Sequence, residues 1–340
     1  MSGSRPISGA SPPAISIITA TYDRPAVLAF AIRSIIAQEF SDWELIVIGD
    51  HCSEPTEALV SSFTDRRIRY INLALNCGEQ SGPNNVGIAR ARGRYVAFLN
   101  HDDIWFPDHL RSAMEWLQAT GADAVIARSA FITRPESAGW DGNDWRCVIN
   151  GKGIEGRYDP VLTVGPASSL VLKIAAVRAA GPWRPALDCF GSSSQQWLFR
   201  IWRTGADLRT MPHLTLVQIP SASRLLSYVR HDTAEHEFFA SQMKDPAALR
   251  LLLLDHDAGL PKRPLWRRLA KPVAISTLRT LARLGYAPSE IIGCVSFGFR
   301  RGFFIRFLRQ RRGLSDIERE PGTAALRARY AAERGRDQAQ

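Results

Sequence analysis

The sequence lacks the features that mark secreted, disulfide-bonded or zinc-binding proteins. Its five cysteines are odd in number and form no Cys-x-x-Cys pair, so neither a disulfide framework nor a zinc site is supported. We therefore expect reduced thiols in a cytosolic protein. Residues 1–13 are rich in Ser, Pro and Gly without the apolar core of a signal peptide, and are expected to form a flexible leader. No uncharged apolar run approaches the roughly 18 residues that a membrane span needs.

Net charge is nearly absent from one part of the chain and concentrated in another. The net charge of the 340 residues is +10, but residues 262–312 alone hold 13 Lys and Arg against one acid, Glu290. The remainder, with 30 basic and 32 acidic residues, is nearly neutral. This distribution argues against nucleic-acid binding by the main domain and predicts an anionic partner for the C-terminal segment.

Residues 14–129 alternate short β-branched runs with segments of helical periodicity. We expect strands at 14–22, 43–49, 68–72, 95–100 and 124–129, and helices at 26–38, 54–62, 82–92 and 107–120. Alternation of this kind with short connections predicts an α/β fold with a mostly parallel, Rossmann-like sheet flanked by helices.

Polar residues follow three of these predicted strands. The first strand leads into Thr21-Tyr22-Asp23-Arg24, the second into Asp50, and the strand at 95–100 into Asp102-Asp103. In open parallel sheets, ligands bind at the edge where the carboxyl ends of the strands meet. Adjacent carboxylates repel unless a cation compensates, and a divalent ion shared with substrate phosphates would do so. Alternatively, Asp103 only caps the helix that follows it.

Three consecutive segments carry a resemblance to a known family. They read ISIITATYDRP, SIIAQEFSDWELIVIGDHCSE and GPNNVGIARARGRYVAFLNHDDIWFPDHL. In order and spacing they resemble the nucleotide-sugar domain of the family 2 inverting glycosyltransferases, which have the GT-A fold. The resemblance is close over residues 14–129 and loose over 168–230. It implies a GT-A sheet to which a basic, helical C-terminal extension is added.

The resemblance also implies roles for single residues in the nucleotide site. Thr21, Tyr22 and Arg24 would line the nucleotide pocket after the first strand. Asp50 would hydrogen-bond the base, and Asn85 would lie near the sugar-nucleotide.

The same resemblance implies a divalent cation, Mn²⁺ or Mg²⁺, that bridges the donor diphosphate. Asp103 would bind this metal, and Asp102 would hold the ribose or the metal. Asn100 stands where the family has a further acid, so metal binding would depend on these two residues. His231 stands where family members often have a histidine near the metal; alternatively, it is an exposed residue after a strand at 225–229.

A catalytic base is harder to assign. An inverting transfer needs a carboxylate to deprotonate the acceptor hydroxyl, and the family places that acid shortly before a helix in the second half of the domain. The matching helix here is expected at 193–204, but Ser and Gln occupy 193–196. The nearest upstream acid is Asp188, which we take as the candidate base; alternatively, Asp188 is a surface-loop residue.

The C-terminal segment combines cationic and aromatic residues. Two helices are expected, at 261–284 and 289–312, and the second carries five Phe beside six Arg. Arginines of such a helix can reach outward while its apolar residues enter a lipid headgroup layer. This predicts binding to an anionic membrane surface; alternatively, the apolar faces cover the globular domain.

Together these observations predict a glycosyltransferase that moves a sugar from a nucleotide-diphosphate sugar to a glycan or lipid-linked acceptor in surface-polysaccharide assembly. The alternatives are an inactive sugar-nucleotide or glycan-binding protein and, on weaker grounds, a nucleotidyltransferase. Residues 14–130 would form the nucleotide-sugar-binding half, 131–259 the acceptor-binding half, 260–313 a basic helical segment and 314–340 a frayed tail. We expect a cytoplasmic protein, peripheral at the inner face of the membrane, that binds no nucleic acid.

Overall fold

The computed structural model describes residues 11–135, 140, 142–151, 156–259 and 265–315. The greater part of the expected leader (1–13) and of the expected frayed tail (314–340) lies outside these residues.

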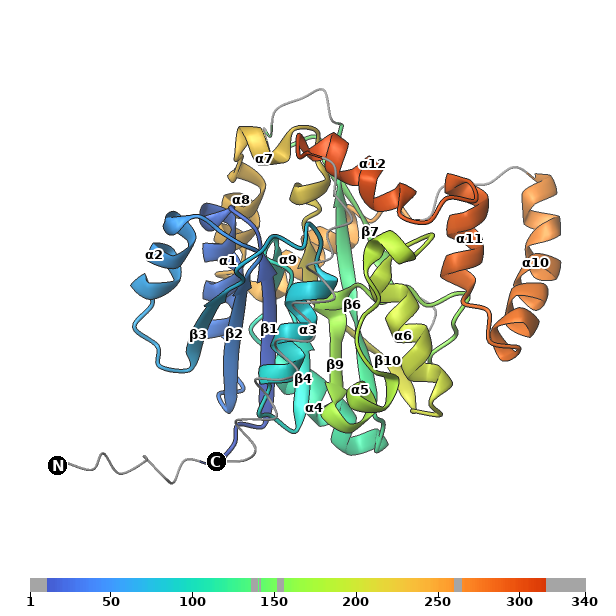
Figure 1. The fold of residues 1–340 in the computed structure, drawn as a ribbon, viewed down its shortest axis with the longest axis horizontal. Helices are drawn as coiled ribbons and strands as arrows, with labels where there is room; N and C mark the ends of the chain where they lie inside the picture. Colours follow the sequence, from blue (N-terminus) through green and yellow to red (C-terminus); the bar gives the residue numbers. More distant parts are fainter. Residues whose placement is uncertain (1–10, 136–139, 141, 152–155, 260–264, 316–340) are drawn as a thin grey trace.

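A single mixed sheet forms the centre of the molecule (Figure 1). Its strands are β1 (Ile15–Thr21), β2 (Trp43–Gly49), β3 (Ile68–Asn72), β4 (Tyr95–Phe98), β5 (Asp103–Trp105), β6 (Ala124–Thr133), β7 (Arg146–Asn150), β8 (Gly156–Arg157), β9 (Leu170–Lys173) and β10 (Leu208–Gln218). The main order is β3-β2-β1-β4-β9-β6-β10-β5, with β7 paired to β6 and β8 to β10.

The parallel arrangement belongs to one half of the sheet. Strands β3, β2, β1 and β4 are parallel to their neighbours, as the alternation of strands and helices predicts. Strand β9 then runs antiparallel to both β4 and β6, whereas β6 and β10 are parallel to each other. The α/β class is confirmed, and the second half of the sheet is mixed rather than parallel.

Helices cover both faces of the sheet. They are α1 (Pro25–Ile36), α2 (Glu54–Ser62), α3 (Ser81–Arg90), α4 (His109–Thr120), α5 (Ile174–Ala180), α6 (Ser193–Arg203), α7 (Ser227–Arg230), α8 (Ala234–Gln242), α9 (Pro246–Asp255), α10 (Leu265–Arg283), α11 (Pro288–Phe297) and α12 (Phe303–Arg312), with the short 3₁₀ helices η1 (Ala167–Ser169), η2 (Ala186–Asp188) and η3 (Ser221–Ser223). One core lies between the sheet and α1 and α4, and another between the sheet and α5 and α6. Because both faces are covered, β1 and β2 are buried along nearly their whole length.

Local sequence signals set the ends of these elements. Helix α1 begins at Pro25, whose missing N–H and fixed φ suit the first helical position. Helix α4 ends before Gly121, which adopts the left-handed conformation (φ 68°). The strand expected at 225–229 is wrong. Leu226 has φ 55°, which is incompatible with an extended strand, and the short helix α7 forms instead.

A buried carboxylate ties strands together at the amino end of the parallel half. Glu44 on β2 accepts hydrogen bonds from Ser16 Oγ of β1 (2.7 Å) and from the backbone N–H of Arg92 (3.0 Å). Both Arg92 and Arg69 also form ion pairs with it, at 2.8 and 2.9 Å. Burial opposes ionisation of Glu44, but the hydrogen bonds from Arg92 and Ser16 outweigh it and lower its pKa.

The C-terminal helices pack against the body. The helix expected at 289–312 is broken at Gly298 and Gly302, both at positive φ, into α11 and α12. Helix α11 approaches the body closely, because a Cβ at Gly293 would meet the carbonyl oxygen of Phe190 at 2.7 Å. Glu290 of α11 also accepts a hydrogen bond from the Phe190 N–H (3.1 Å). Part of the C-terminal segment therefore covers the globular domain, which is what the alternative to membrane binding predicted.

Within the described residues, no helix has both the length and the apolar character required to cross a bilayer. Figure 1 shows α10 and α11 at the side of the molecule remote from β3, with α12 crossing back toward α7. Contacts of α12 with α7, η3 and η2 bring it over the carboxyl ends of the strands.

Candidate functional site

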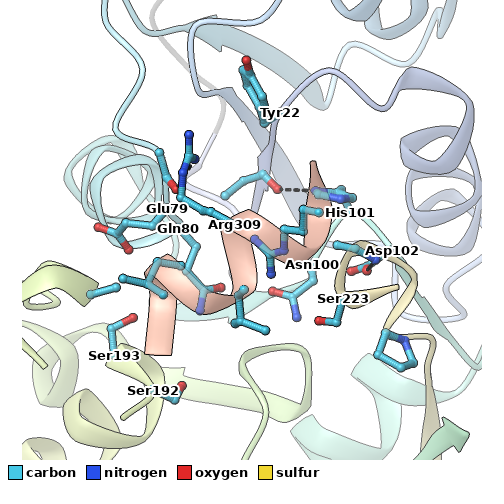
Figure 2. A pocket seen from close by; sticks show the side chains of 18 of the residues that line it. Tyr22, Glu79, Gln80, Asn100, His101, Asp102, Ser192, Ser193, Ser223 and Arg309 are labelled. Atoms are coloured by element: carbon cyan, nitrogen blue, oxygen red, sulfur yellow. Dashed lines mark hydrogen bonds between the residues drawn. The ribbon is translucent and has the colours of Figure 1, made fainter. Parts of the chain in front are cut away.

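A cavity of about 440 Å³ lies at the carboxyl edge of the parallel strands, where the polar clusters were predicted to meet. Its floor comes from the residues that follow β1, β2 and β4, and its walls from the loop before α3, the start of α6 and the segment around η3. Helix α12 crosses the cavity and lines it from the side opposite the sheet (Figure 2). The sequence-predicted residues that line it are Thr21, Tyr22, Asp50, Asp102 and Asp103.

The residues after β1 divide between the cavity and its support. Thr21 is buried, and its hydroxyl has no hydrogen-bond partner among the described residues. Tyr22 lines the cavity, with its ring 5.9 Å from that of Tyr228. Arg24 is buried behind the cavity, where it donates a hydrogen bond to Ser221 Oγ (2.9 Å) and lies over the Tyr228 ring. Arg24 therefore fixes the wall and does not line the cavity.

Asp50 fastens the loop that precedes α3. Its two carboxylate oxygens accept hydrogen bonds from the backbone N–H groups of Cys77 (2.6 Å) and Gly78 (2.9 Å). Burial raises the pKa of Asp50 to about 6, although both hydrogen bonds favour the ionised form. Asp50 thus shapes the cavity at the end of β2, where the resemblance expects the nucleotide base.

Both carboxylate oxygens of Asp103 accept hydrogen bonds from other residues of the chain. One carboxylate oxygen accepts from Ser168 Oγ (2.5 Å) and Asn100 Nδ2 (3.1 Å), and the other accepts from the Ile219 N–H (3.1 Å). Burial and the neighbouring Asp102 raise the pKa of Asp103 well above its usual range. Asp103, expected as the main metal ligand, therefore joins β4, β10 and η1 with both of its oxygens.

Asp102 is held through one oxygen only. Its Oδ2 accepts from the Ala222 N–H (2.9 Å) and from Ser221 Oγ (3.3 Å), and within the described part of the chain no hydrogen bond reaches its Oδ1. Burial opposes ionisation of Asp102, but the neighbouring His101, the charge of Arg24 and the Ala222 N–H favour the carboxylate, and the pKa of Asp102 is lowered. Asp102 therefore presents at the cavity a carboxylate oxygen to which no described residue donates a hydrogen bond.

These residues fit a divalent cation that is held largely by its substrate. No group of three or more His, Cys, Asp or Glu side chains in the described ranges could hold a metal ion. Mg²⁺-type sites, however, need only one or two carboxylates when substrate phosphates and water supply the other ligands. The free Oδ1 of Asp102 meets that requirement, whereas the oxygens of Asp103 already have protein donors.

Two buried histidines, and not His231, accompany Asp102. His231 is exposed, adopts a left-handed φ of 48° and does not line the cavity. His101 lines the cavity, and burial lowers its pKa to about 4. His236 of α8 contacts the carbonyl oxygen of Asp102 through Nε2 (3.1 Å) and stacks on Phe30. The described histidine that lines the cavity is therefore His101, and the structure places His231 outside the lining.

Asn85 and Asp188 also lie outside the cavity lining. The amide of Asn85 is held by the backbone of Trp183, with Nδ2 donating to its carbonyl (3.0 Å) and Oδ1 accepting from its N–H (2.8 Å). Asn85 thus joins α3 to the loop before η2. Asp188 ends η2 with an exposed side chain, although Ala186 of the same turn lines the cavity.

An acid that the sequence analysis did not single out lines the cavity instead. Glu79 accepts hydrogen bonds from the N–H (2.7 Å) and the hydroxyl of Ser81 at the start of α3. The backbone of Ala186 lies beside its carboxylate, so Glu79 stands where the loop before α3 meets η2. Burial raises the pKa of Glu79 to about 7. Its place in a loop, without a motif, hid it from sequence reasoning.

Comparison with known proteins agrees with this geometry. A family model described as "Glycosyl transferase family 2" matches residues 16–173. The succinoglycan biosynthesis protein ExoO of Rhizobium meliloti is 38% identical over 114 residues, which are 34% of this chain and 32% of that protein. The Escherichia coli enzyme WfgD, named as a UDP-Glc:α-D-GlcNAc-diphosphoundecaprenol β-1,3-glucosyltransferase, is 34% identical over 28% of this chain and 38% of that protein. The chain thus spans about a third of the length of these relatives.

A solved structure shows the same fold. S. aureus TarS 1–349, in complex with UDP, superimposes with a TM-score of 0.51 at 13% identity, covering 90% of this chain and 94% of the TarS 1–349 chain. The overlay includes the second half of the sheet and extends past the 158 residues that the family model spans.

Proposed function

The chain belongs to the family 2 glycosyltransferases through residues 16–173, and on this premise we propose that it transfers a sugar from a nucleotide-diphosphate sugar to a glycan or lipid-linked acceptor. The observation that carries the proposal is the cavity at the carboxyl edge of β1, β2 and β4, lined by the acids of the motif segments. The donor and lipid-linked acceptor in the name of WfgD support both substrate classes, and the role of ExoO in succinoglycan synthesis supports a polysaccharide pathway.

Donor binding follows from the walls of the cavity. We assign the nucleotide to the side formed by Thr21, Tyr22 and Asp50, where an aromatic ring, an unpartnered hydroxyl and a buried carboxyl adjoin. Arg24 and Asn85 would act indirectly, because both hold wall segments by hydrogen bonds and neither lines the cavity.

The metal site is assigned to Asp102. A divalent cation, Mn²⁺ or Mg²⁺, bound there with the donor would offset the charge of the departing diphosphate. Asp103 would keep the loop after β4 in place, and His231 would have no part in binding, since its side chain is exposed outside the cavity.

Two acids are candidates for the base of an inverting transfer. Asp188 has the sequence position that the family resemblance suggests, but it is exposed outside the cavity lining. Glu79 lines the cavity beside η2, and its pKa of about 7 suits a general base near neutral pH. The geometry therefore favours Glu79 over Asp188.

An anionic membrane surface is the proposed site of action, at the cytoplasmic face where a lipid-linked acceptor would be presented. Large apolar side chains remain exposed on α11 and around α12: Val295 is 78% exposed and Phe299 87%. Arg300 and Arg301 follow directly and are also exposed. Insertion of the apolar groups and attraction of the arginines to lipid phosphates would act together.

Vesicle sedimentation tests this membrane proposal on the full chain. Binding to anionic vesicles should be strong, should weaken as salt rises and should nearly vanish on neutral vesicles. Phe299→Ser should reduce binding, whereas Leu75→Ser, a matched change at an exposed site on the far β3 side (42% exposed), should not. Equal binding of the Phe299→Ser variant and the parent chain would refute the assignment.

The transfer proposal is tested by incubating the protein with UDP-, GDP- and dTDP-sugars, with Mn²⁺ or with EDTA, and measuring released nucleoside diphosphate with and without lipid-linked acceptors. One donor should give metal-dependent release that an acceptor accelerates. Donor binding without release or transfer would favour the alternative, an inactive sugar-nucleotide-binding protein. Release of pyrophosphate from a nucleoside triphosphate and a sugar phosphate would favour a nucleotidyltransferase.

A further inference from the structure

Helix α12 forms one wall of the donor cavity, although it lies about 130 residues beyond the end of the family match. Five of its ten residues line the cavity, namely Phe304, Ile305, Leu308, Arg309 and Arg312. Their spacing of one, three or four residues puts them on a single face of the helix. Figure 2 shows this helix crossing the cavity between the side of Glu79 and Gln80 and the side of Asn100 and Asp102.

Hydrogen bonds attach α12 to three separate parts of the body. The N–H of Gly302, its N-cap, donates to the carbonyl of Cys189 (2.8 Å), and the carbonyl of Arg311 near its end accepts from the Leu226 N–H (2.8 Å). Between them, Arg309 Nη1 donates to the carbonyl of Gly78 (2.8 Å) in the loop that Asp50 holds. The position of α12 over the cavity is therefore fixed by the fold.

The two cavity-lining arginines have no carboxylate partner among the described residues. Arg309 is only 7% exposed, and its guanidinium donates to two carbonyl oxygens, those of Gly78 and Ser315. Arg312 is half-buried, and its Nε has no hydrogen-bond partner in the described ranges. Buried guanidinium groups are normally paired with an anion, because an unpaired charge is costly to remove from water.

The described acids of the cavity form no ion pair with these two arginines. Asp50 and Asp103 accept their hydrogen bonds from backbone and neutral side-chain donors on the floor. Arg309 is nonetheless close enough for its charge to act on Asp50, and the charge of Arg312 acts on His101, next to Asp102. The two guanidinium groups thus extend from the proposed nucleotide side of the cavity to the proposed metal side.

We propose that Arg309 and Arg312 bind the diphosphate of the donor, so that α12 is part of the donor site. The inference rests on the proposed function and adds to it two donor-binding residues from outside the family match. Guanidinium groups form charge-assisted, often bidentate hydrogen bonds with phosphate oxygens. A cavity of about 440 Å³ falls in the range that binds small ligands of nucleotide size.

The test measures binding of a nucleoside series to the full chain by calorimetry. UDP, GDP and dTDP are first compared for binding to the parent chain. For the nucleobase that gives the tightest binding, the nucleoside, its monophosphate and its diphosphate are then titrated into each variant, once with Mn²⁺ and once with EDTA. Arg312→Ala is the principal variant, because Arg312 makes no hydrogen bond with the described protein and its removal should not disturb folding. Arg309→Gln, which keeps a donor for the Gly78 carbonyl, is the second. Arg178→Ala removes an equal charge from an exposed site on α5 outside the cavity and is the control.

We expect each cavity variant to weaken diphosphate binding about tenfold or more, since hydrogen bonds between charged groups are strong. Binding of the nucleoside should change less than twofold, and the control should match the parent chain. Unchanged diphosphate binding in both cavity variants would overturn the inference and leave the proposed function standing. Equal losses for nucleoside and diphosphate would also overturn it, because they indicate a structural role for α12. If the parent chain binds none of the three diphosphates, the proposed function itself fails.

Discussion

Buried acids at the two ends of the same parallel strands have different partners: ion pairs at the amino end, and neutral hydrogen-bond donors at the carboxyl end. At the amino end, Glu44 is ion-paired with Arg69 and Arg92 and hydrogen-bonded to Ser16, so that opposite charges of the chain satisfy one another. At the carboxyl end, Asp50 is held by backbone N–H groups, while Arg309 faces it without forming an ion pair.

This difference separates stability from function within one sheet. Charged groups that form ion pairs with each other are not available to a ligand. The interactions at the amino end accordingly stabilise the contact between β1 and β2. At the carboxyl end, the described acids accept hydrogen bonds from neutral donors and form no ion pair with the arginines. Both the negative and the positive groups therefore remain available to interact with a bound molecule. Substitutions at the carboxyl end should therefore change binding and transfer, whereas substitutions at the amino end should change the free energy of unfolding.

The largest effect is expected at the proposed base. Glu79→Gln should keep the hydrogen bonds with Ser81 and lower the transfer rate by roughly 100- to 10,000-fold, because a positioned base contributes about that much. Donor affinity should stay near that of the parent chain. The measurement is the initial rate of transfer with whichever donor the nucleotide-release assay selects, together with calorimetric donor binding.

Asp188→Ala is the matched variant, since it removes the other candidate acid from an exposed site next to the same turn. It should transfer at the parent rate. If Asp188→Ala loses transfer while Glu79→Gln retains it, the two assignments must be exchanged.

The next effect separates two adjacent acids. Asp102→Asn should abolish the Mn²⁺-dependent part of donor binding and lower activity by more than about 100-fold, the upper figure for changes around a metal ligand. Its melting temperature should change little, because Ala222 and Ser221 can still donate to the amide oxygen.

Asp103→Asn should behave in the opposite manner. An amide at this position turns an N–H₂ group toward one of three protein donors, which should cost on the order of 1–3 kcal/mol of stability. Melting curves with and without Mn²⁺ and donor check both variants. Loss of metal-dependent binding in Asp103→Asn with an unchanged melting temperature would restore Asp103 as the ligand.

The contrast between the acids also shows how far sequence reasoning extends. The periodicity of residues 14–129 sufficed for the strands and helices of the parallel half, and strand order then brought Tyr22, Asp50 and Asp102 to one edge. Local pattern could not reveal which oxygen of each acid is occupied, because Ser168 and Ile219 reach Asp103 from other parts of the chain.

The contribution of α12 was hidden for a similar reason. Its alternation of Arg with Phe and Ile fits a membrane-surface helix and a cavity wall equally well, and only the break at Gly298 and Gly302 decides how it folds back. His236 was missed because helix α8, and not the segment ending at His231, packs beside Asp102. Long-range packing decided each of these cases.

At the amino end, Glu44→Gln should lower stability and leave the site intact. The substitution removes two ion pairs and a charge-assisted hydrogen bond with Ser16, for which a loss of roughly 2 kcal/mol is expected. In a chain of this size that is a fall of several degrees in melting temperature. Diphosphate binding by the folded variant should equal that of the parent chain. A weakened affinity would show that the two ends of the sheet are coupled.

The smallest expected effect is a pH dependence at the carboxyl end. The pKa of Glu79 is raised to about 7 and that of Asp50 to about 6, whereas both acids titrate near pH 4 in an unfolded chain. Between about pH 4 and 7 the folded chain therefore binds more protons at these positions than the unfolded chain, so their contribution to stability falls as pH rises through that window. Buried His101 and His109, whose pKa values are lowered to about 4 and about 3, act in the opposite direction over part of it.

Because these contributions oppose each other, the melting temperature of the parent chain alone does not isolate the acids, but a difference between variants does. Glu79→Gln cannot ionise, so its melting temperature should nearly equal that of the parent chain at pH 4 and exceed it at pH 8, with the change centred below pH 7. Asp188→Asn, which removes an acid that is exposed outside the cavity lining, is the control. A difference for Glu79→Gln that does not change with pH would mean that Glu79 is already ionised at pH 5, and would remove the electrostatic reason for preferring it as the base.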